Sequence, residues 1–160
     1  MGTELSSSTT LIPEWTDDVR LLALPWLDQQ TLLLLREVLT ALASYHSEVL
    51  AVILFGSVAR HDERSLDDSE PSDVDLLLLV NPEKGQSRLS LERTVAIYQT
   101  VGGLQHQHRS TPREVQVTIA ECDLADCGLA FIENVARDGI LLWAKEPLPA
   151  PLRTVQITSR

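Results

Sequence analysis

The sequence predicts a single domain of the α/β class, in an α+β arrangement with a small sheet flanked by helices. Short apolar runs that suit buried strands alternate with longer segments whose leucines and valines recur at helical spacing. A chain of 160 residues is also long enough to bury one core of its own. The domain is expected over residues 28–146, after an N-terminal extension (1–27) and before a C-terminal tail (147–160).

Composition narrows the classes of function. A hydrophobic content of 44% with 22% charged residues is ordinary for a soluble globular protein. The net charge of −10 argues against non-specific nucleic-acid binding, which needs basic patches. It does not exclude binding of a nucleotide whose phosphates are screened by a metal ion. We expect no membrane span and no signal peptide. Cys122 and Cys127 suit neither a zinc site nor a disulfide scaffold, so a cytoplasmic location is expected.

The first elements are a helix and a strand. Asp28 is typical of an N-cap, and the helix it starts runs to about His46 with leucines facing the sheet. An apolar strand over Leu50–Phe55 follows. The extension before them contains Trp15 and Trp26, which either pack on the surface of the domain or contact a partner.

The centre of the chain joins two strands through an acidic loop. Gly56 and Ser57 end the first strand, and a short helix is expected over Val58–His61. The segment 62–72 is dense in Asp and Glu and is interpreted as a solvated loop. A second apolar strand, Val74–Val80, begins beside Asp73 and Asp75.

Asp73 and Asp75 carry the chemistry of this stretch. They project from the same face of a strand because side chains alternate with period two. Two like charges held so close repel each other unless a cation bridges them, which indicates a divalent-metal site; structural salt bridging is the alternative. The Gly56-Ser57 turn supplies main-chain N–H groups for a phosphate. Metal and phosphate groups together point to nucleotide chemistry.

The second half predicts a helix, a strand, a helix and a strand. The first helix spans about Arg88–Val101, ended by Gly102-Gly103 and followed by a loop over 104–112. Val115, Val117 and Ile119 alternate with polar residues in a strand over Glu114–Ile119. The remaining signals are a cap at Asp123 or Asp126, a helix to about Arg137 that Gly139 ends, a strand over Ile140–Ala144, and a proline-rich tail without regular structure.

Gly56-Ser57-Val58-Ala59-Arg60 followed by Ser72-Asp73-Val74-Asp75-Leu76 resembles the signature of the polymerase-beta-type nucleotidyltransferases, and among them the minimal nucleotidyltransferase (MNT) domains. Fifteen residues separate Ser57 from Asp73, a few more than usual, in a turn where insertions are tolerated. The resemblance covers roughly residues 28–145 and implies a small mixed sheet flanked by helices.

The resemblance also implies roles for these residues. Asp73 and Asp75 would hold two Mg²⁺ ions, and Gly56 and Ser57 the β- and γ-phosphates of ATP or another nucleoside triphosphate. Arg60 would lie near the phosphates or pair with the acidic turn. The family carries a third carboxylate, the general base, on the strand over 114–119. On its polar face only Glu114 is acidic, and Gln116 or Thr118 is the alternative for the aligned position.

The activity implied is metal-dependent transfer of a nucleoside monophosphate, AMP from ATP, to a hydroxyl acceptor. The chain leaves no room for the helical substrate domain of larger members, so the acceptor would lie on a partner protein, such as a HEPN-type toxin, or on a second subunit. One alternative is a binding or regulatory, antitoxin-like module that has lost the third acid. Another is a small-molecule (antibiotic) nucleotidyltransferase.

Overall fold

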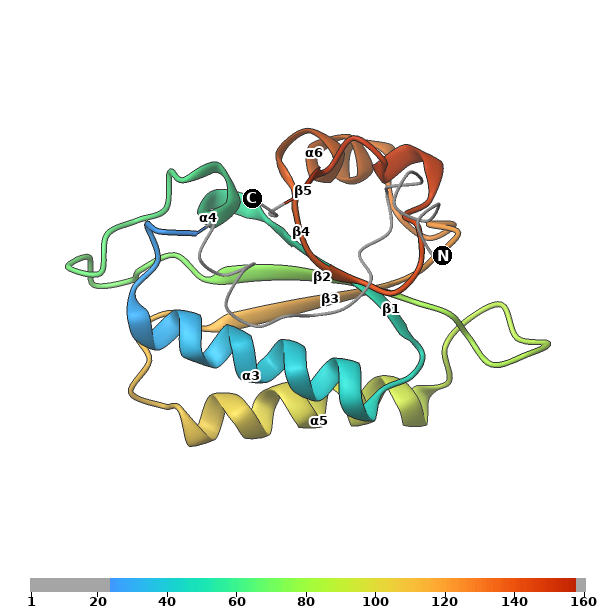
Figure 1. The fold of residues 1–160 in the computed structure, drawn as a ribbon, viewed down its shortest axis with the longest axis horizontal. Helices are drawn as coiled ribbons and strands as arrows, with labels where there is room; N and C mark the ends of the chain where they lie inside the picture. Colours follow the sequence, from blue (N-terminus) through green and yellow to red (C-terminus); the bar gives the residue numbers. More distant parts are fainter. Residues whose placement is uncertain (1–23, 158–160) are drawn as a thin grey trace, which may run out of the picture.

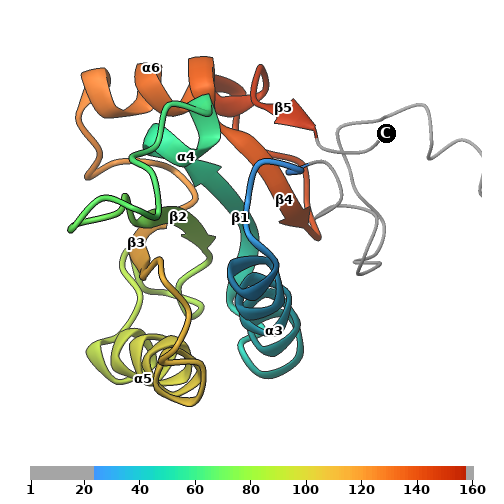
Figure 2. The same ribbon diagram turned by 90° about the vertical axis from the view of Figure 1, so that its left-hand side faces the viewer.

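A computed structural model describes residues 24–157 and shows a mixed sheet with helices on both faces, which confirms the predicted fold class (Figures 1 and 2). Trp15 and the first part of the predicted extension lie outside the described residues. Within 24–157, none of the helices has the length and apolarity that a membrane crossing requires. In chain order the elements are α3 (Gln29–Tyr45), β1 (Val49–Phe55), α4 (Gly56–Arg60), β2 (Val74–Val80), α5 (Leu91–Gln107), β3 (Val115–Glu121), α6 (Leu129–Asp138), β4 (Ile140–Ala144), a 3₁₀ helix (Ala150–Leu152) and β5 (Gln156–Ile157).

The strands form one sheet in the order β3-β2-β1-β4-β5. β1 is antiparallel to both of its neighbours, β2 and β4. β2 pairs in parallel with β3, and the connection between these two strands is the helix α5. The start of β2 therefore lies next to the end of β1 on one side and the start of β3 on the other, which is where Gly56, Asp75 and Gln116 meet.

The central strands are buried on both faces, which explains their continuous apolar runs. Side chains on one face pack with α3 and α5, and those on the other face pack with α6 and the 3₁₀ helix. Figure 2 shows α3 and α5 below the sheet and α4 and α6 above it. On β2 the two sets alternate, with Leu76 and Leu78 facing α3 and α5, and Leu77 and Leu79 facing α6.

The start of α3 is as predicted. Asp28 is its N-cap, and its carboxylate accepts hydrogen bonds from the main-chain N–H and the hydroxyl of Thr31. Leu24 and Leu27 are buried in the core, so the last residues of the predicted extension pack into the fold. Trp26 packs there too: its indole N–H donates to the carbonyl of Val58, 2.9 Å away, at α4.

The prediction that Gly102-Gly103 ends the second long helix is wrong. α5 continues through both glycines to Gln107, so the predicted loop begins only after that residue. Glycine weakens a helix interior by about 1 kcal/mol relative to alanine, but packing outweighs this preference. Val101 is buried and Leu104 packs against the core on the following turn, which keeps the helix going.

Two further expectations are corrected by the structure. The N-cap of α6 is Gly128 rather than Asp123 or Asp126; Asp123 accepts a turn hydrogen bond from Ala125, and Asp126 pairs with Arg88. The proline-rich tail, expected to lack regular structure, forms the 3₁₀ helix and the short strand β5. Proline suits the first positions of a helix, and burial of Leu152 and Val155 then holds this segment against the sheet.

The extended α5 makes a direct prediction. An added Cβ at Gly102 or Gly103 meets nothing within 4 Å, and both positions are exposed. We expect Gly102→Ala and Gly103→Ala each to raise the free energy of unfolding by about 0.5–1 kcal/mol in urea denaturation, because alanine favours a helix interior. A loss of stability would instead indicate a left-handed terminus at these glycines and a shorter helix.

Candidate active site

Asp73 and Asp75 share a face of the sheet, as their spacing predicts. Asp73 immediately precedes β2 and Asp75 is the second residue of that strand, with the buried Val74 between them. Both carboxylate residues are partly buried rather than fully solvated. Their face is also that of Leu77, which packs toward α6. The pair therefore lies at the start of an apolar strand, and the next residue on the same face, Leu77, already belongs to the core.

The main chain of Gly56 lies directly against Asp75. β1 ends at Phe55, which is paired with Asp75 across the antiparallel ladder. The next residue, Gly56, turns with φ of +80°, a conformation that side chains rarely adopt. A Cβ at Gly56 would overlap the Oδ2 atom of Asp75 and lie 3.2 Å from its Cγ. Glycine is therefore required twice here, by the turn and by the carboxylate.

The electrostatics of the pair favour a cation. Burial raises the pKa of the Asp75 carboxyl above its ordinary value, the nearby Asp73 raises it further, and Arg60 lowers it in part. Ionisation of Asp75 therefore costs free energy in the folded protein, and a bound divalent ion would offset this cost. Carboxylate oxygens are the ligands that Mg²⁺ prefers, so the donor set fits. Within residues 24–157 no group of three or more ligand side chains is assembled, and the site consists of this pair.

The short helix α4 begins where β1 ends. The N–H groups of its first turn, at Gly56, Ser57 and Val58, have no partners within the helix, and Gly56 itself lies against Asp75. Arg60, at the end of α4, pairs with Asp62 at 3.3 Å and lies 4.0 Å from a carboxylate oxygen of Asp138. Its side chain remains 44% exposed. Phosphate contacts by Gly56, Ser57 and Arg60 stay a prediction.

The register of β3 decides which residue is aligned with Asp75. In the parallel pairing of β2 and β3, Asp75 is opposite Gln116, and Thr118 is opposite Leu77. Glu114 lies two residues before Gln116 on the same face and is exposed. Its carboxylate accepts a hydrogen bond from the amide of Gln116 at 3.2 Å. The aligned position thus carries an amide, and the role of Glu114 as general base stays a prediction.

Three residues that the sequence did not assign to the site shape this end of the molecule, and Trp26 follows the first of its two predicted alternatives by packing on the domain. Trp26 stacks on His61 with ring centroids 4.6 Å apart, beside α4. His61 itself adopts φ of 60°, at a position where glycine would be expected. Arg113 is buried and bonds to the main chain of the acidic loop. A lone arginine before a strand gives no sequence signal, whereas the left-handed residue after a short helix could have been suspected.

Two hollows flank β3, and neither includes the aspartate pair. One of about 420 Å³ lies between α5, β3 and α6, with Tyr98 and Phe131 in its wall. Another of about 260 Å³ lies between α5 and β3 and reaches Glu114 and Gln116. The Asp75 carboxyl is the stronger indicator, because burial and the nearby Asp73 raise its pKa, and perturbed carboxylates cluster at functional sites.

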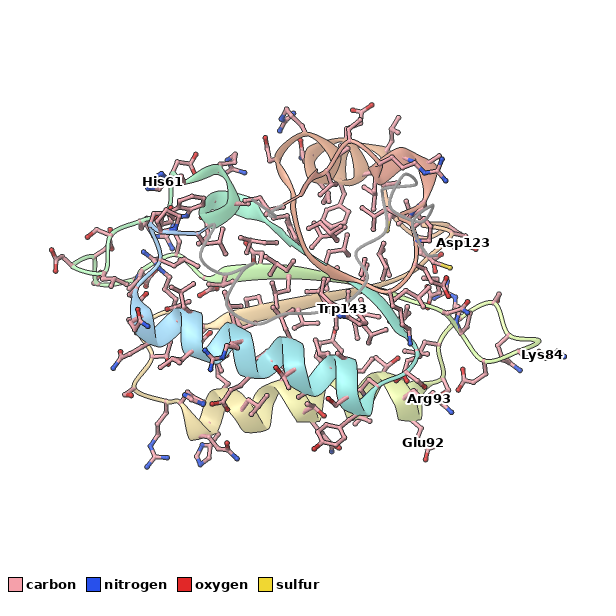
Figure 3. All side chains as sticks on the ribbon, in the orientation of Figure 1. His61, Lys84, Glu92, Arg93, Asp123 and Trp143 are labelled. Atoms are coloured by element: carbon pink, nitrogen blue, oxygen red, sulfur yellow. The ribbon has the colours of Figure 1, made fainter. Side chains whose placement is uncertain are left out.

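A second polar cluster lies at the opposite end of the molecule and is paired internally. Figure 3 shows Arg93 and Lys84 at the end away from His61. Arg93 contacts Glu48 at 3.4 Å and Glu83 at 2.9 Å. Glu48 also faces His46 at 3.6 Å. These mutual contacts explain the cluster as structural.

The close approach of Gly56 to Asp75 can be tested by substitution. Gly85 provides a matched control, since it has φ of +86° but no atom within 4 Å of an added Cβ. We expect Gly85→Ala to cost about 1 kcal/mol, from backbone conformation alone. Gly56→Ala should cost about 3 kcal/mol because it also displaces the carboxylate. Equal losses in chemical denaturation would contradict the contact.

The burial of Asp75 beside the like-charged Asp73 leads to a second prediction. In metal-free buffer at pH 7, Asp75→Asn should raise the melting temperature by roughly 2–4 °C, or about 1 kcal/mol for a chain of this size, because an ionised, partly buried carboxylate is removed. Mg²⁺ should then stabilise the wild type and not the variant. Asp67→Asn, in the exposed loop, serves as the control and should change neither quantity. A less stable Asp75→Asn chain would show that the carboxylate supports the fold instead.

Comparisons with known proteins identify the family of the chain. The family model "Polymerase beta, Nucleotidyltransferase" matches residues 37–147, which include α4, β2 and β3. No curated protein matches the chain. One similar solved structure is the crystal structure of a toxin-antitoxin with AMP-PNP, at 14% identity, a TM-score of 0.45, and coverage of 74% of this chain and 76% of that chain. Another is a Sulfolobus solfataricus protein assigned as a nucleotidyltransferase, at 19% identity, a TM-score of 0.46, and coverage of 81% and 91%. On the family model, the chain belongs to the polymerase beta nucleotidyltransferase family.

Proposed function

We propose that this protein is a metal-dependent nucleotidyltransferase that transfers AMP from ATP to a hydroxyl group of a partner protein, such as a HEPN-type toxin. The observation that carries the proposal is the partly buried Asp73/Asp75 pair, with the Gly56 main chain against the second carboxylate. Membership in the family supports the class of reaction. The two cysteines in the described part of the chain are free thiols, in keeping with a reducing, cytoplasmic setting.

In this proposal, each residue of the site has a separate role. Asp73 and Asp75 hold the metal, and the first-turn N–H groups of Gly56 and Ser57 donate to the β- and γ-phosphates. Arg60, at the end of the same helix, leaves Asp62 and stabilises phosphate charge; its electrostatic effect on Asp75 supports this role. Mg²⁺, when bound, stabilises charge on the attacking and leaving oxygens.

Glu114 acts on the acceptor. Its exposed carboxylate accepts the proton of the acceptor hydroxyl, whose oxygen forms a bond to the α-phosphorus while the bond to pyrophosphate breaks. The amide of Gln116 holds that carboxylate at 3.2 Å, on the face that carries the aspartates. The products are an AMP-modified hydroxyl and pyrophosphate.

A second candidate function is favoured by one observation. The position aligned with Asp75 holds Gln116, whose amide neither binds Mg²⁺ as a carboxylate does nor accepts a proton. A chain with two acids in place of three would transfer slowly or not at all. In this version the protein is an antitoxin-like module that binds nucleotide weakly and acts by covering its partner.

The two candidates are separated by a transfer assay. The wild type, Asp73→Asn, Asp75→Asn and the control Asp67→Asn are each incubated with Mg²⁺, ATP labelled at the α-phosphate, and the product of the neighbouring gene. We expect label on the partner with the wild type and Asp67→Asn, and a loss of at least about 100-fold with either site variant, corresponding to several kcal/mol of transition-state stabilisation.

A parallel reaction with ATP labelled at the γ-phosphate distinguishes nucleotide transfer from phosphate transfer. Label from the γ-position on the partner would contradict AMP transfer. No label from either position, with the partner still bound in a pull-down, would establish the binding module. In that case Gln116→Asp is the informative variant, because it restores an acid opposite Asp75.

A further inference from the structure

Asp73 is the less constrained of the two aspartates. Asp75 lies inside the β2 ladder, whereas Asp73 precedes the strand and follows the acidic loop. The strand pairings therefore fix the position of Asp75, whereas the position of Asp73 depends on the residues next to it in the chain. Ser72, on one side, is 5% exposed, and Val74, on the other, is fully buried.

Arg113 holds the residue before Asp73. This arginine is 4% exposed, and its guanidinium donates to the carbonyl of Ser72 at 2.8 Å and to the carbonyl of Arg64 at 2.9 Å. The hydroxyl of Ser72 in turn accepts from the main-chain N–H of Arg64 at 2.7 Å. The three bonds join the two ends of the loop over 64–72, residues 64 and 72, which we call its neck, while residues 65–70 at its tip stay exposed.

The residue after Asp73 is tied to the same place. The N–H of Val74 donates to the carbonyl of Glu114, 2.8 Å away, and Glu114 follows Arg113 in the chain. The peptide groups on both sides of Asp73 are thus bonded to the dipeptide 113–114 at the head of β3. A guanidinium presents its donors in a rigid fork, so it fixes two carbonyls relative to each other better than a single donor does.

We propose that Arg113 is a positioning residue for Asp73, holding this aspartate in place for metal binding although the loop before it is long and exposed. The inference rests on the proposed function, since it concerns the same metal site. It adds a residue that touches neither metal nor substrate and that acts through the main chain of Ser72. The bonds of Arg113 hold residues 64 and 72 together, so they separate the exposed tip of the acidic loop from Asp73.

The test compares Arg113→Gln and Arg113→Lys with the wild type and with a matched control, Arg64→Gln. The control removes the side-chain bond from Arg64 Nε to the carbonyl of Glu70, 2.6 Å long, while its main-chain atoms stay in the neck. Two readouts are made on the full chain: the Kd for Mn²⁺ by electron paramagnetic resonance, and amide hydrogen exchange along the loop and the sheet.

We expect the Kd for Mn²⁺ to rise at least tenfold in Arg113→Gln and less in Arg113→Lys, with faster exchange confined to the amides of residues 64–74. Arg64→Gln should match the wild type in both readouts. An unchanged Kd in Arg113→Gln would overturn the inference while leaving the proposed function intact. Faster exchange throughout the sheet, with the Kd unchanged in the folded fraction, would show a general structural role and would also overturn it.

The failure of the proposed function gives a different pattern. A wild-type chain that binds no Mn²⁺ would contradict the metal site itself. The exchange data then decide the positioning inference alone, since a loss of protection at 64–74 supports it and unchanged protection overturns it. If Arg113→Gln does not fold, the same criteria apply to Arg113→Lys, which keeps a cationic donor at the neck.

Discussion

The site depends on the contact between the main chain of Gly56 and the carboxylate of Asp75. This contact brings the end of β1 against the start of β2, so that main-chain N–H groups of α4 and the Asp75 carboxylate lie together, as the proposed function requires. The arrangement also has a cost, because burial raises the pKa of the Asp75 carboxyl and the nearby Asp73 raises it further. A fold that tolerates this arrangement sacrifices stability for ligand binding, as active sites commonly do.

The sheet can hold such a site because its central strands are buried on both faces. Apolar packing against α3 and α5 on one side and α6 on the other fixes β1 and β2 along their length. The partly exposed positions of these two strands, Phe55 and Asp75, lie at one end of the pair, beside Asp73. Arg113 bonds to the main chain just before Asp73, which lies one residue before the strand. On the neighbouring strand β3, the residue opposite Asp75 is Gln116, which carries no carboxylate.

Much of this could be predicted from the sequence, because local signals agree with the fold. β2 and β4 have the predicted bounds, since each is an apolar run, interrupted in β2 only by Asp75, between polar residues or glycine. The length of α5 could not be predicted, because packing of Leu104 outweighs the local preference of two glycines. The alignment of Gln116 with Asp75 also escaped prediction. Alternation shows which face a residue occupies, but the pairing of strands is set by contacts far apart in the chain.

The proposed function requires a metal ion at the Asp73/Asp75 pair. The most direct measurement is a crystal structure of the protein grown with Mn²⁺ and a non-hydrolysable ATP analogue, with the ion located by its anomalous scattering. We predict an anomalous peak in contact with the carboxylates of both Asp73 and Asp75, with the triphosphate against the N–H groups of Gly56 and Ser57. Nucleotide bound elsewhere, such as in the hollow between α5 and α6, with no peak at the pair, would contradict the central claim.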